Sequence, residues 1–245
     1  MTAPSASAIG LSGQPPLGLE PSDMVEEPDT FPTFEQQTAF MSRQTELARI
    51  LEGEHVDLVV SAPGGGAERI VLATEPNRPI QSMPADYWVQ LAVGVAGLMI
   101  GAWVWALRRN DPAAFLLYLT GACLMLAAVA ASVYSTRELA IDAVLFRVLS
   151  SLNHLGSIGF GAALISLLLV YPKRLVPFGW TVGVWVLTLA VWMAQNLQLS
   201  GDASAATYGV IFLDFVIIAI LLGIQFFVAR KDLRARAALG WFGLS

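Results

Sequence analysis

Five long apolar segments fill most of the chain after residue 86, and they restrict it to a helical membrane protein. We expect spans at residues 87–107, 113–134, 155–171, 176–195 and 208–229, with a partial sixth at 237–245. A bilayer core takes about 20 helical residues to cross, and 56% hydrophobic with only 13% charged residues fits such a bundle. The expected fold is mainly α, with a small α+β outer fragment. Because the sixth segment has so few residues, we expect the protein to continue past it.

Charge is distributed unevenly, which predicts the orientation. Residues 1–86 hold 13 of the 19 acidic residues and four of the 14 basic ones. Short connections on one side carry most of the remaining basic residues, and the other side carries only Arg137 and Arg147. The more basic side faces the cytoplasm, so residues 1–86 are expected outside. The basic connections contain Arg108, Arg109, Lys173, Arg174, Arg230, Lys231, Arg234 and Arg236.

Residues 1–86 divide by composition. Residues 1–32 are rich in proline, glycine and acidic residues, so we expect an irregular segment. Residues 33–79 are expected to form a helix, opened by a capping box at Thr33, and then a hairpin of two strands. Residues 80–245 form the membrane region. A helix and one hairpin bury little surface by themselves.

Small residues recur at helical spacing in two of the expected spans. Such residues allow two helix backbones to approach closely. They indicate either a homodimer seam or packing within one chain. The residues are Gly94, Gly97 and Gly101 in the first span, and Ser157 and Gly161 in the third.

Polar residues at membrane depth are costly and mark candidate sites. Asp214 lies about 9 Å into its span, six residues after Tyr208. Asn153 and His154 precede the third span, and Arg147 lies in the preceding amphipathic loop, 135–152, with Glu138 and Asp142. We expect a cluster near the outer face that receives a polar ligand or senses protons. The alternative is that Asp214 pairs with Arg147 or His154 only to fix the helices.

Catalytic motifs are missing from the sequence. With two histidines, His55 and His154, an HExxH zinc site is impossible, and no Walker A loop is present. Neither a Cys/His metal set nor a G-x-S-x-G elbow occurs, and the single Cys123 permits no intrachain disulfide. We therefore expect no catalytic residue, metal or cofactor in this chain, and no nucleic-acid partner.

Several short sequences resemble a known family. They are VYSTRELA at 133–140, Phe146-Arg147, LNHLG at 152–156 and YPKR at 171–174. Together with the layout of residues 12–245, they are similar to the sensor region of bacterial two-component histidine kinases of the multi-span quorum-sensing type. The helix and hairpin, with SGQP at 12–15, resemble the C-terminal half of a PDZ-like domain.

The resemblance implies a protein of the bacterial cytoplasmic membrane that perceives an unknown outer ligand and controls a kinase inside. It implies ATP and Mg²⁺ only for a kinase domain, and a response regulator as partner. The phospho-accepting helix and the ATP-binding domain of that family lie outside these residues. Two alternatives stay open: a transporter-associated protein, which predicts inverted repeats and broken helices, and a membrane scaffold that recruits partners through its outer part.

Overall fold

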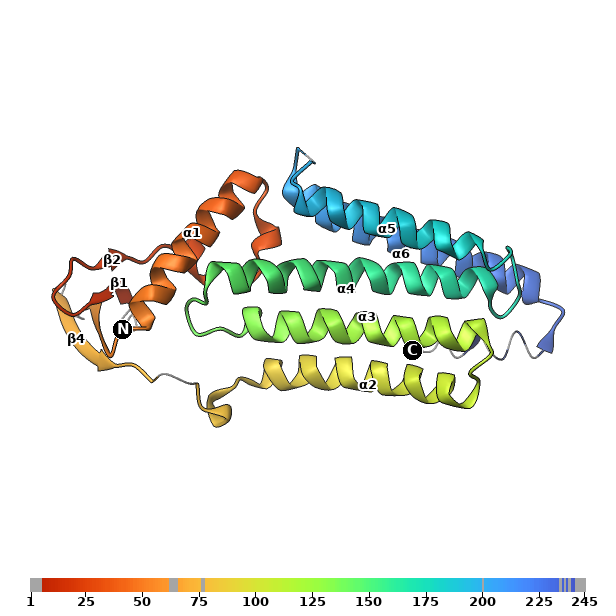
Figure 1. Cartoon of the computed structure of the whole chain (residues 1–245), viewed down its shortest axis with the longest axis horizontal. Helices are drawn as coiled ribbons and strands as arrows, with labels where there is room; N and C mark the ends of the chain where they lie inside the picture. Colours follow the sequence, from red (N-terminus) through yellow and green to blue (C-terminus); the bar gives the residue numbers. More distant parts are fainter. Residues whose placement is uncertain are drawn as a thin grey trace.

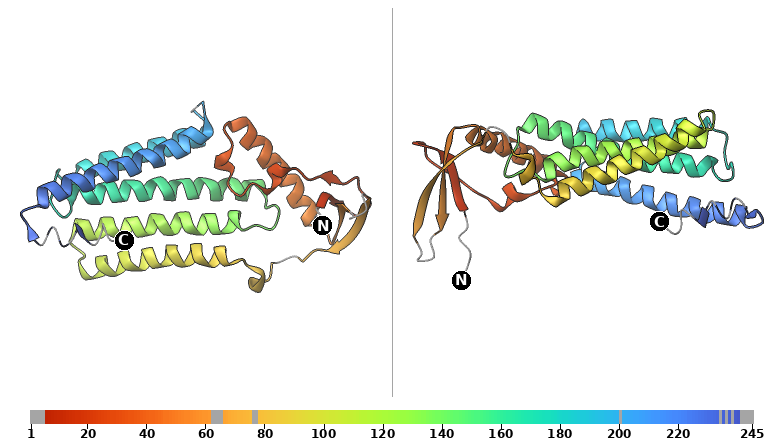
Figure 2. Two further views of the ribbon diagram at one scale, coloured as in Figure 1. Left: turned by 180° about the vertical axis from the view of Figure 1, so that it is seen from behind. Right: turned by 90° about the horizontal axis from the view of Figure 1, so that it is seen from below.

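The computed structural model describes residues 6–61, 66–75, 78–199, 201–233, 235, 237, 239 and 240. An α+β domain, whose elements begin at Ala6 and end at Ala73 and which is here called the outer domain, lies at one end of a row of long helices (Figures 1 and 2). Residues 63–65 of the expected hairpin turn, 63–66, lie outside the described residues, as do Arg234 and Arg236. Of the expected sixth span only residues 237, 239 and 240 are described, and Leu239 packs with Ala229 and Ala235.

The outer domain is a four-stranded antiparallel sheet with one helix packed on it. The sheet order is β2-β1-β3-β4, with Ile9 opposite Leu58 and Val56 opposite Leu72. Helix α1 begins after Thr33, whose side chain accepts a hydrogen bond from the Gln36 amide at 3.2 Å. The elements are β1 (Ala6–Leu11), β2 (Leu17–Gly18), α1 (Phe34–Leu51), β3 (His55–Ser61) and β4 (Ala67–Ala73).

The expectation of an irregular segment at 1–32 is wrong for β1, β2 and two short 3₁₀ helices, Pro21–Met24 and Pro28–Thr30. Strand β1 completes the fold because it pairs with β3 and supplies Ile9 to a core with Leu47 and Val56. One acidic residue of the segment also contributes to the packing of α1. Asp23 is buried and accepts a 2.5 Å hydrogen bond from Arg43 Nε on α1.

Five helices make up the membrane region: α2 (Ala85–Leu107), α3 (Pro112–Ser135), α4 (Ala143–Val170), α5 (Trp180–Asn196) and α6 (Ala203–Ala229). Among the described residues four of these, all but α5, are long and apolar enough to cross a bilayer. The chain is thus mainly helical and has the features of a multi-pass membrane protein. Helix α5 has 17 residues, or about 26 Å at 1.5 Å per residue.

Helix α4 is longer than expected, and the predicted loop 135–152 is wrong for most of its length. The helix starts at Ala143 because the Asp142 side chain caps it, accepting hydrogen bonds from the amides of Val144 and Leu145 at 2.9 and 3.1 Å. Its 28 residues make α4 about 42 Å long. The first three turns extend beyond the expected span, 155–171, toward α1 of the outer domain, with which α4 is in contact.

The small residues pack helices together within the chain. A Cβ on Gly101 would lie 2.7 Å from the Leu117 carbonyl oxygen of α3, and one on Gly94 would lie 2.8 Å from Ala128 Cβ. On α4, a Cβ on Gly156 would lie 2.5 Å from the Ala127 amide nitrogen. These glycines hold α2 against α3 and α3 against α4, as the intrachain alternative predicted.

Candidate functional site at the junction of the outer domain and the bundle

The outer domain and the helix bundle share a hydrophobic core. Phe40 and Met41 of α1 pack with Tyr134 of α3 and Phe146 of α4. The ring centroids of Phe40 and Phe146 are 5.5 Å apart, and those of Tyr134 and Phe146 are 5.3 Å apart. Burial of these aromatic side chains fixes α1 on the end of α3 and the start of α4.

Arg137 crosses this junction. Its guanidinium donates to the carbonyls of Val25, Glu26 (3.2 Å) and Tyr134 (2.7 Å), and to Gln44 Oε1 (3.2 Å). It also lies 4.8 Å from the Phe146 ring centroid. Burial lowers the pKa of Arg137, an effect opposed by the nearby charge of Glu26. Among the described residues its hydrogen-bond acceptors are main-chain carbonyls and an amide, so the cation links three segments without a carboxylate contact.

The connection between α3 and α4 is inserted into the outer domain. Leu139 and Ala140 pack against the Ile9, Leu47 and Val56 core. Glu138 forms an ion pair with Arg78 at 3.2 Å, and its side chain is exposed. An exposed pair of this kind contributes about 0–1 kcal/mol. The apolar contacts of Leu139 and Ala140 therefore contribute most of the binding between this connection and the outer domain.

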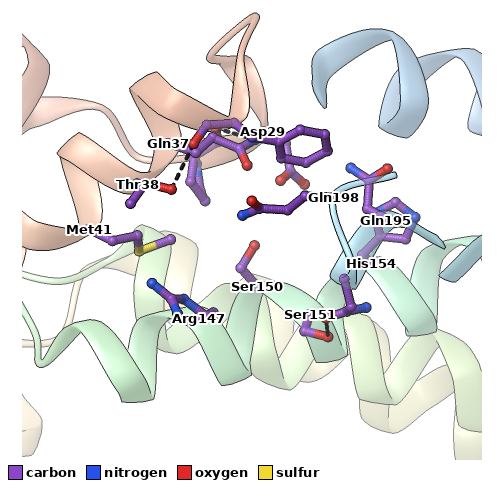
Figure 3. Close-up of a pocket in the computed structure, with 13 residues that line it drawn as sticks. Asp29, Gln37, Thr38, Met41, Arg147, Ser150, Ser151, His154, Gln195 and Gln198 are labelled. Atoms are coloured by element: carbon purple, nitrogen blue, oxygen red, sulfur yellow. Dashed lines mark hydrogen bonds between the residues drawn. The ribbon is translucent and has the colours of Figure 1, made fainter. Parts of the chain in front are cut away.

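A polar cavity of about 100 Å³ lies beside this junction and is here called the junction pocket (Figure 3). Its walls come from the outer domain, from α4 and from the end of α5. Hydroxyl and amide groups dominate the lining, with one carboxyl, one guanidinium and one imidazole. The lining residues are Pro28, Asp29, Phe34, Gln37, Thr38, Met41, Arg147, Ser150, Ser151, His154, Gln195, Asn196 and Gln198.

His154 and Asp29 give the junction pocket its chemical character. His154 is 5% exposed, and its Nε2 has no hydrogen-bond partner among the described residues. A buried polar atom without a partner is costly, so a ligand group or water at this position is favoured. Burial raises the pKa of Asp29 to about 6, with a further contribution from Glu27. Arg147 supplies the exposed positive charge of the pocket wall.

Hydrogen bonds connect the junction pocket to α5 and α6. Ser151 Oγ donates to Asn196 Oδ1 at 2.6 Å, and Trp192 Nε1 donates to the Ser151 carbonyl at 3.0 Å. Gln195 Nε2 donates to Thr207 Oγ1 of α6 at 2.7 Å. The start of α6 is also bound to the outer domain, because the Ala203 amide donates to the Pro32 carbonyl at 3.1 Å.

The structure divides the predicted cluster. Arg147 and His154 both line the junction pocket. Asn153 instead donates to the Ala127 carbonyl at 3.0 Å and so joins α4 to α3. Asp142 caps α4 and Glu138 pairs with Arg78. The prediction of one cluster is therefore wrong for these three residues: Asn153 lies on the α4 face that meets α3, and Glu138 and Asp142 precede the helix and have other partners.

Asp214 lies in a different cavity. It lines an apolar space of about 240 Å³ between α3, α4 and α6. A Cβ on Gly161 would lie 2.7 Å from Asp214 Cγ, which places the carboxyl directly against α4. His154 lies seven residues earlier on α4, about 10 Å away along the axis. Among the described residues, no hydrogen bond or ion pair joins Asp214 to Arg147 or His154, so the predicted pairing is not found.

Asp29, Thr38, Gln195 and Gln198 were not predicted as site residues. They come from two parts of the chain far apart in sequence, 29–38 and 195–198, and only the docking of α1 brings them together. The sequence places the expected cluster only on the membrane side of the junction, because the composition of 1–32 predicts an irregular segment. Pro28, in the EEPDTFP sequence at 26–32, is almost fully buried. A proline-rich acidic segment gives no sequence signal of such burial.

Comparison with family models, with curated proteins and with solved structures finds no match to the chain. Among the described residues, no three His, Cys, Asp or Glu side chains lie together in a way that would hold a metal ion. The junction pocket and its connections are therefore the features of this chain that bear on its function.

Proposed function

We propose that this chain is the signal-sensing membrane module of a receptor, and that a polar ligand occupies the junction pocket. The observation that carries the proposal is the composition of the pocket wall. It combines residues of the outer domain with residues of α4 and α5, so a ligand there contacts both parts and favours one docked arrangement over another.

The ligand class follows from the lining. Arg147 offers a cation, His154 Nε2 an unpartnered polar atom, and Thr38, Ser150 and the amides offer further hydrogen bonds. A small polar molecule with an anionic group suits this set. Protonation of Asp29 removes a competing negative charge, so such a ligand binds more tightly as the pH falls through about 6.

Transmission to the inner side runs along α4. The helix is continuous from the junction pocket to Val170. At its far end Gln225 Nε2 of α6 donates to the Leu168 carbonyl at 2.6 Å and to the Lys173 carbonyl at 2.7 Å. Lys173 also pairs with Asp232 at 2.5 Å. A change in docking at the outer end of α4 therefore reaches the α4–α6 contact at the other end.

The proposed orientation places the outer domain outside a bacterial cytoplasmic membrane, with five crossings. Arg108, Lys173 and Arg230 follow α2, α4 and α6 at the bundle end remote from the outer domain (Figure 1), which supports the positive-inside assignment. The crossing by α5 is supported by its position antiparallel to α6 and by its 17 apolar-rich residues, the lower limit for a span.

The resemblance to sensor histidine kinases supports a kinase as the proposed output, with ATP, Mg²⁺ and a response regulator acting there. A PDZ-like origin of the outer domain is supported by the order α1, β3, β4. The coding sequence that follows Ser245 tests the kinase assignment. We expect further spans and then a cytoplasmic helix with a phospho-accepting histidine; a stop codon soon after Ser245 would contradict it.

The scaffold alternative has one observation in its favour. Strand β4 is an edge strand, exposed along its whole length, and it displays Ile70, Val71 and Leu72. Such an edge is able to add a strand from a partner.

The sensing proposal is tested by measuring whether the two ends of the bundle are coupled. Spin labels at Arg174 and Arg230, in a Cys123→Ser background in nanodiscs, report the inner spacing of α4 and α6. Arg137→Ala releases the outer domain, and we expect the spacing to shift by about 1–2 Å, the usual size of helix shifts. Identical distance distributions with and without Arg137 would contradict signal transmission, and would leave a scaffold role.

A further inference from the structure

The cavity around Asp214 combines an apolar lining with one carboxyl group. Its lining comes from α3, α4 and α6, and the polar side chains among the lining residues are Asp214 and Ser157. Phe215, on the cavity wall, is 64% exposed, so the wall borders the lipid. The lining residues are Leu124, Ala127, Ser157, Phe160, Gly161, Ile211, Asp214, Phe215 and Ile218.

Asp214 lies near the middle of the membrane, deeper than the sequence indicated. Gln225 of α6 is hydrogen-bonded at the level of Leu168 and Lys173, the inner end of α4. Asp214 is 11 residues before Gln225, or about 16 Å farther along the axis. A hydrocarbon core of about 30 Å places that level close to its centre.

The position of the carboxyl depends on Gly161. A Cβ at this position would lie 2.7 Å from Asp214 Cγ and 2.9 Å from its Cβ. Any larger residue would therefore push the carboxyl away from α4. Among the described residues no hydrogen bond or ion pair holds the carboxyl oxygens of Asp214. An ionised carboxylate without a partner is costly at this depth, and a cation brought in by a ligand removes that cost.

We propose that this cavity binds a hydrophobic amine, with its ammonium group paired to Asp214 and its hydrocarbon part against Phe160, Phe215 and Ile218. The charge selects an amine over a fatty acid, whose carboxylate would be repelled by Asp214. The apolar lining selects a hydrophobic amine over a hydrophilic one. Ser157 adds a hydroxyl as a second hydrogen-bond partner. The site is separate from the junction pocket and does not depend on the proposed sensing role.

The test is binding of dodecylamine to the whole chain in nanodiscs, measured by native mass spectrometry, with dodecanol as the uncharged ligand of equal length. We expect one dodecylamine per chain and little dodecanol. Asp214→Asn and Gly161→Ala should each lower dodecylamine occupancy by at least about tenfold, because loss or displacement of one partner leaves the other charge without compensation. Asp86→Asn removes an exposed carboxyl in the first turn of α2 and should leave occupancy unchanged.

Folding is checked by the thermal midpoint of each variant. Asp214→Asn removes a group that is costly in the membrane, so it is expected to fold. Equal dodecylamine occupancy in the wild type and Asp214→Asn would overturn the proposal. So would equal binding of dodecanol and dodecylamine, or no bound dodecylamine on the folded wild-type chain.

Discussion

Replacement of Arg137 by alanine should detach the outer domain from the bundle without unfolding either part. Among the described residues, the guanidinium makes three hydrogen bonds across the junction, to the carbonyls of Val25 and Glu26 and to Gln44, and one within its own segment to the Tyr134 carbonyl. Hydrogen bonds from a charged donor contribute about 1.5–3 kcal/mol each, and burial of the cation offsets several kcal/mol of that sum. We expect a net loss of about 3 kcal/mol in docking free energy, roughly a hundredfold change in the docking equilibrium.

Hydrogen–deuterium exchange of the whole chain in nanodiscs measures this loss. Amides of Val25, of the 3₁₀ helix Pro28–Thr30 and of the first turns of α1 should exchange about a hundredfold faster in Arg137→Ala, while α2 and α3 stay protected. Arg147→Ala is the matched control, because it removes a cation of the same junction that, among the described residues, makes no hydrogen bond or ion pair in this network. Unchanged exchange in Arg137→Ala, or an equal effect of Arg147→Ala, would refute the reasoning.

Three further predictions concern stability. Asp29 binds its proton more tightly when folded, with a pKa of about 6 against 3.8. Its contribution to thermal stability should therefore be full below about pH 4 and be lost, by up to about 3 kcal/mol, as pH rises through 6. Asp29→Asn should remove this part of the pH dependence, and an unchanged difference between the two chains from pH 5 to 7 would contradict it. Gly121→Ala should cost about 1–3 kcal/mol in thermal unfolding, because its Cβ would meet the Gly97 backbone. Gly183→Ala, whose Cβ meets nothing within 4 Å, should be neutral or stabilising. An equal loss of stability in Gly121→Ala and Gly183→Ala would contradict the close packing at Gly121. Phe146→Ala should cost about 3–5 kcal/mol and separate α1 from α4, read by the same exchange measurement; full protection of α1 in this variant would be contrary to the shared core.

The apolar segments predicted the helices of the membrane region well because lipid imposes helical structure wherever a long apolar run occurs. The prediction failed at the helix ends that adjoin the outer domain. Asp142 and Arg147 make 135–152 resemble a loop, yet Asp142 caps α4 and Phe146 packs against Phe40 of α1 as well as Tyr134 of α3. The partner in α1 belongs to a separate part of the sequence, so no local pattern reveals the extension of α4.

The outer domain was also hard to predict from local sequence patterns. Strand β1 pairs with β3 across more than 40 residues, from Ile9 to Leu58, and such distant pairing leaves little local signal. Among the candidate site residues, His154 and Arg147 were found because ionisable groups beside a span are rare. Their companions Asp29 and Thr38 belong to ordinary polar segments, and only the docked arrangement gives them a role.

Crosslinking across the junction pocket in intact cells tests the central claim most directly, that an outer domain is docked on α4 outside the membrane. Thr38 of α1 and Ser150 of α4 both line the pocket, and Cys123→Ser removes the native thiol. A short, membrane-impermeant bis-maleimide should join Thr38→Cys to Ser150→Cys without permeabilisation, and Arg137→Ala should reduce the yield. A crosslink that forms only after permeabilisation would reverse the orientation, and no crosslink under either condition would contradict the docking.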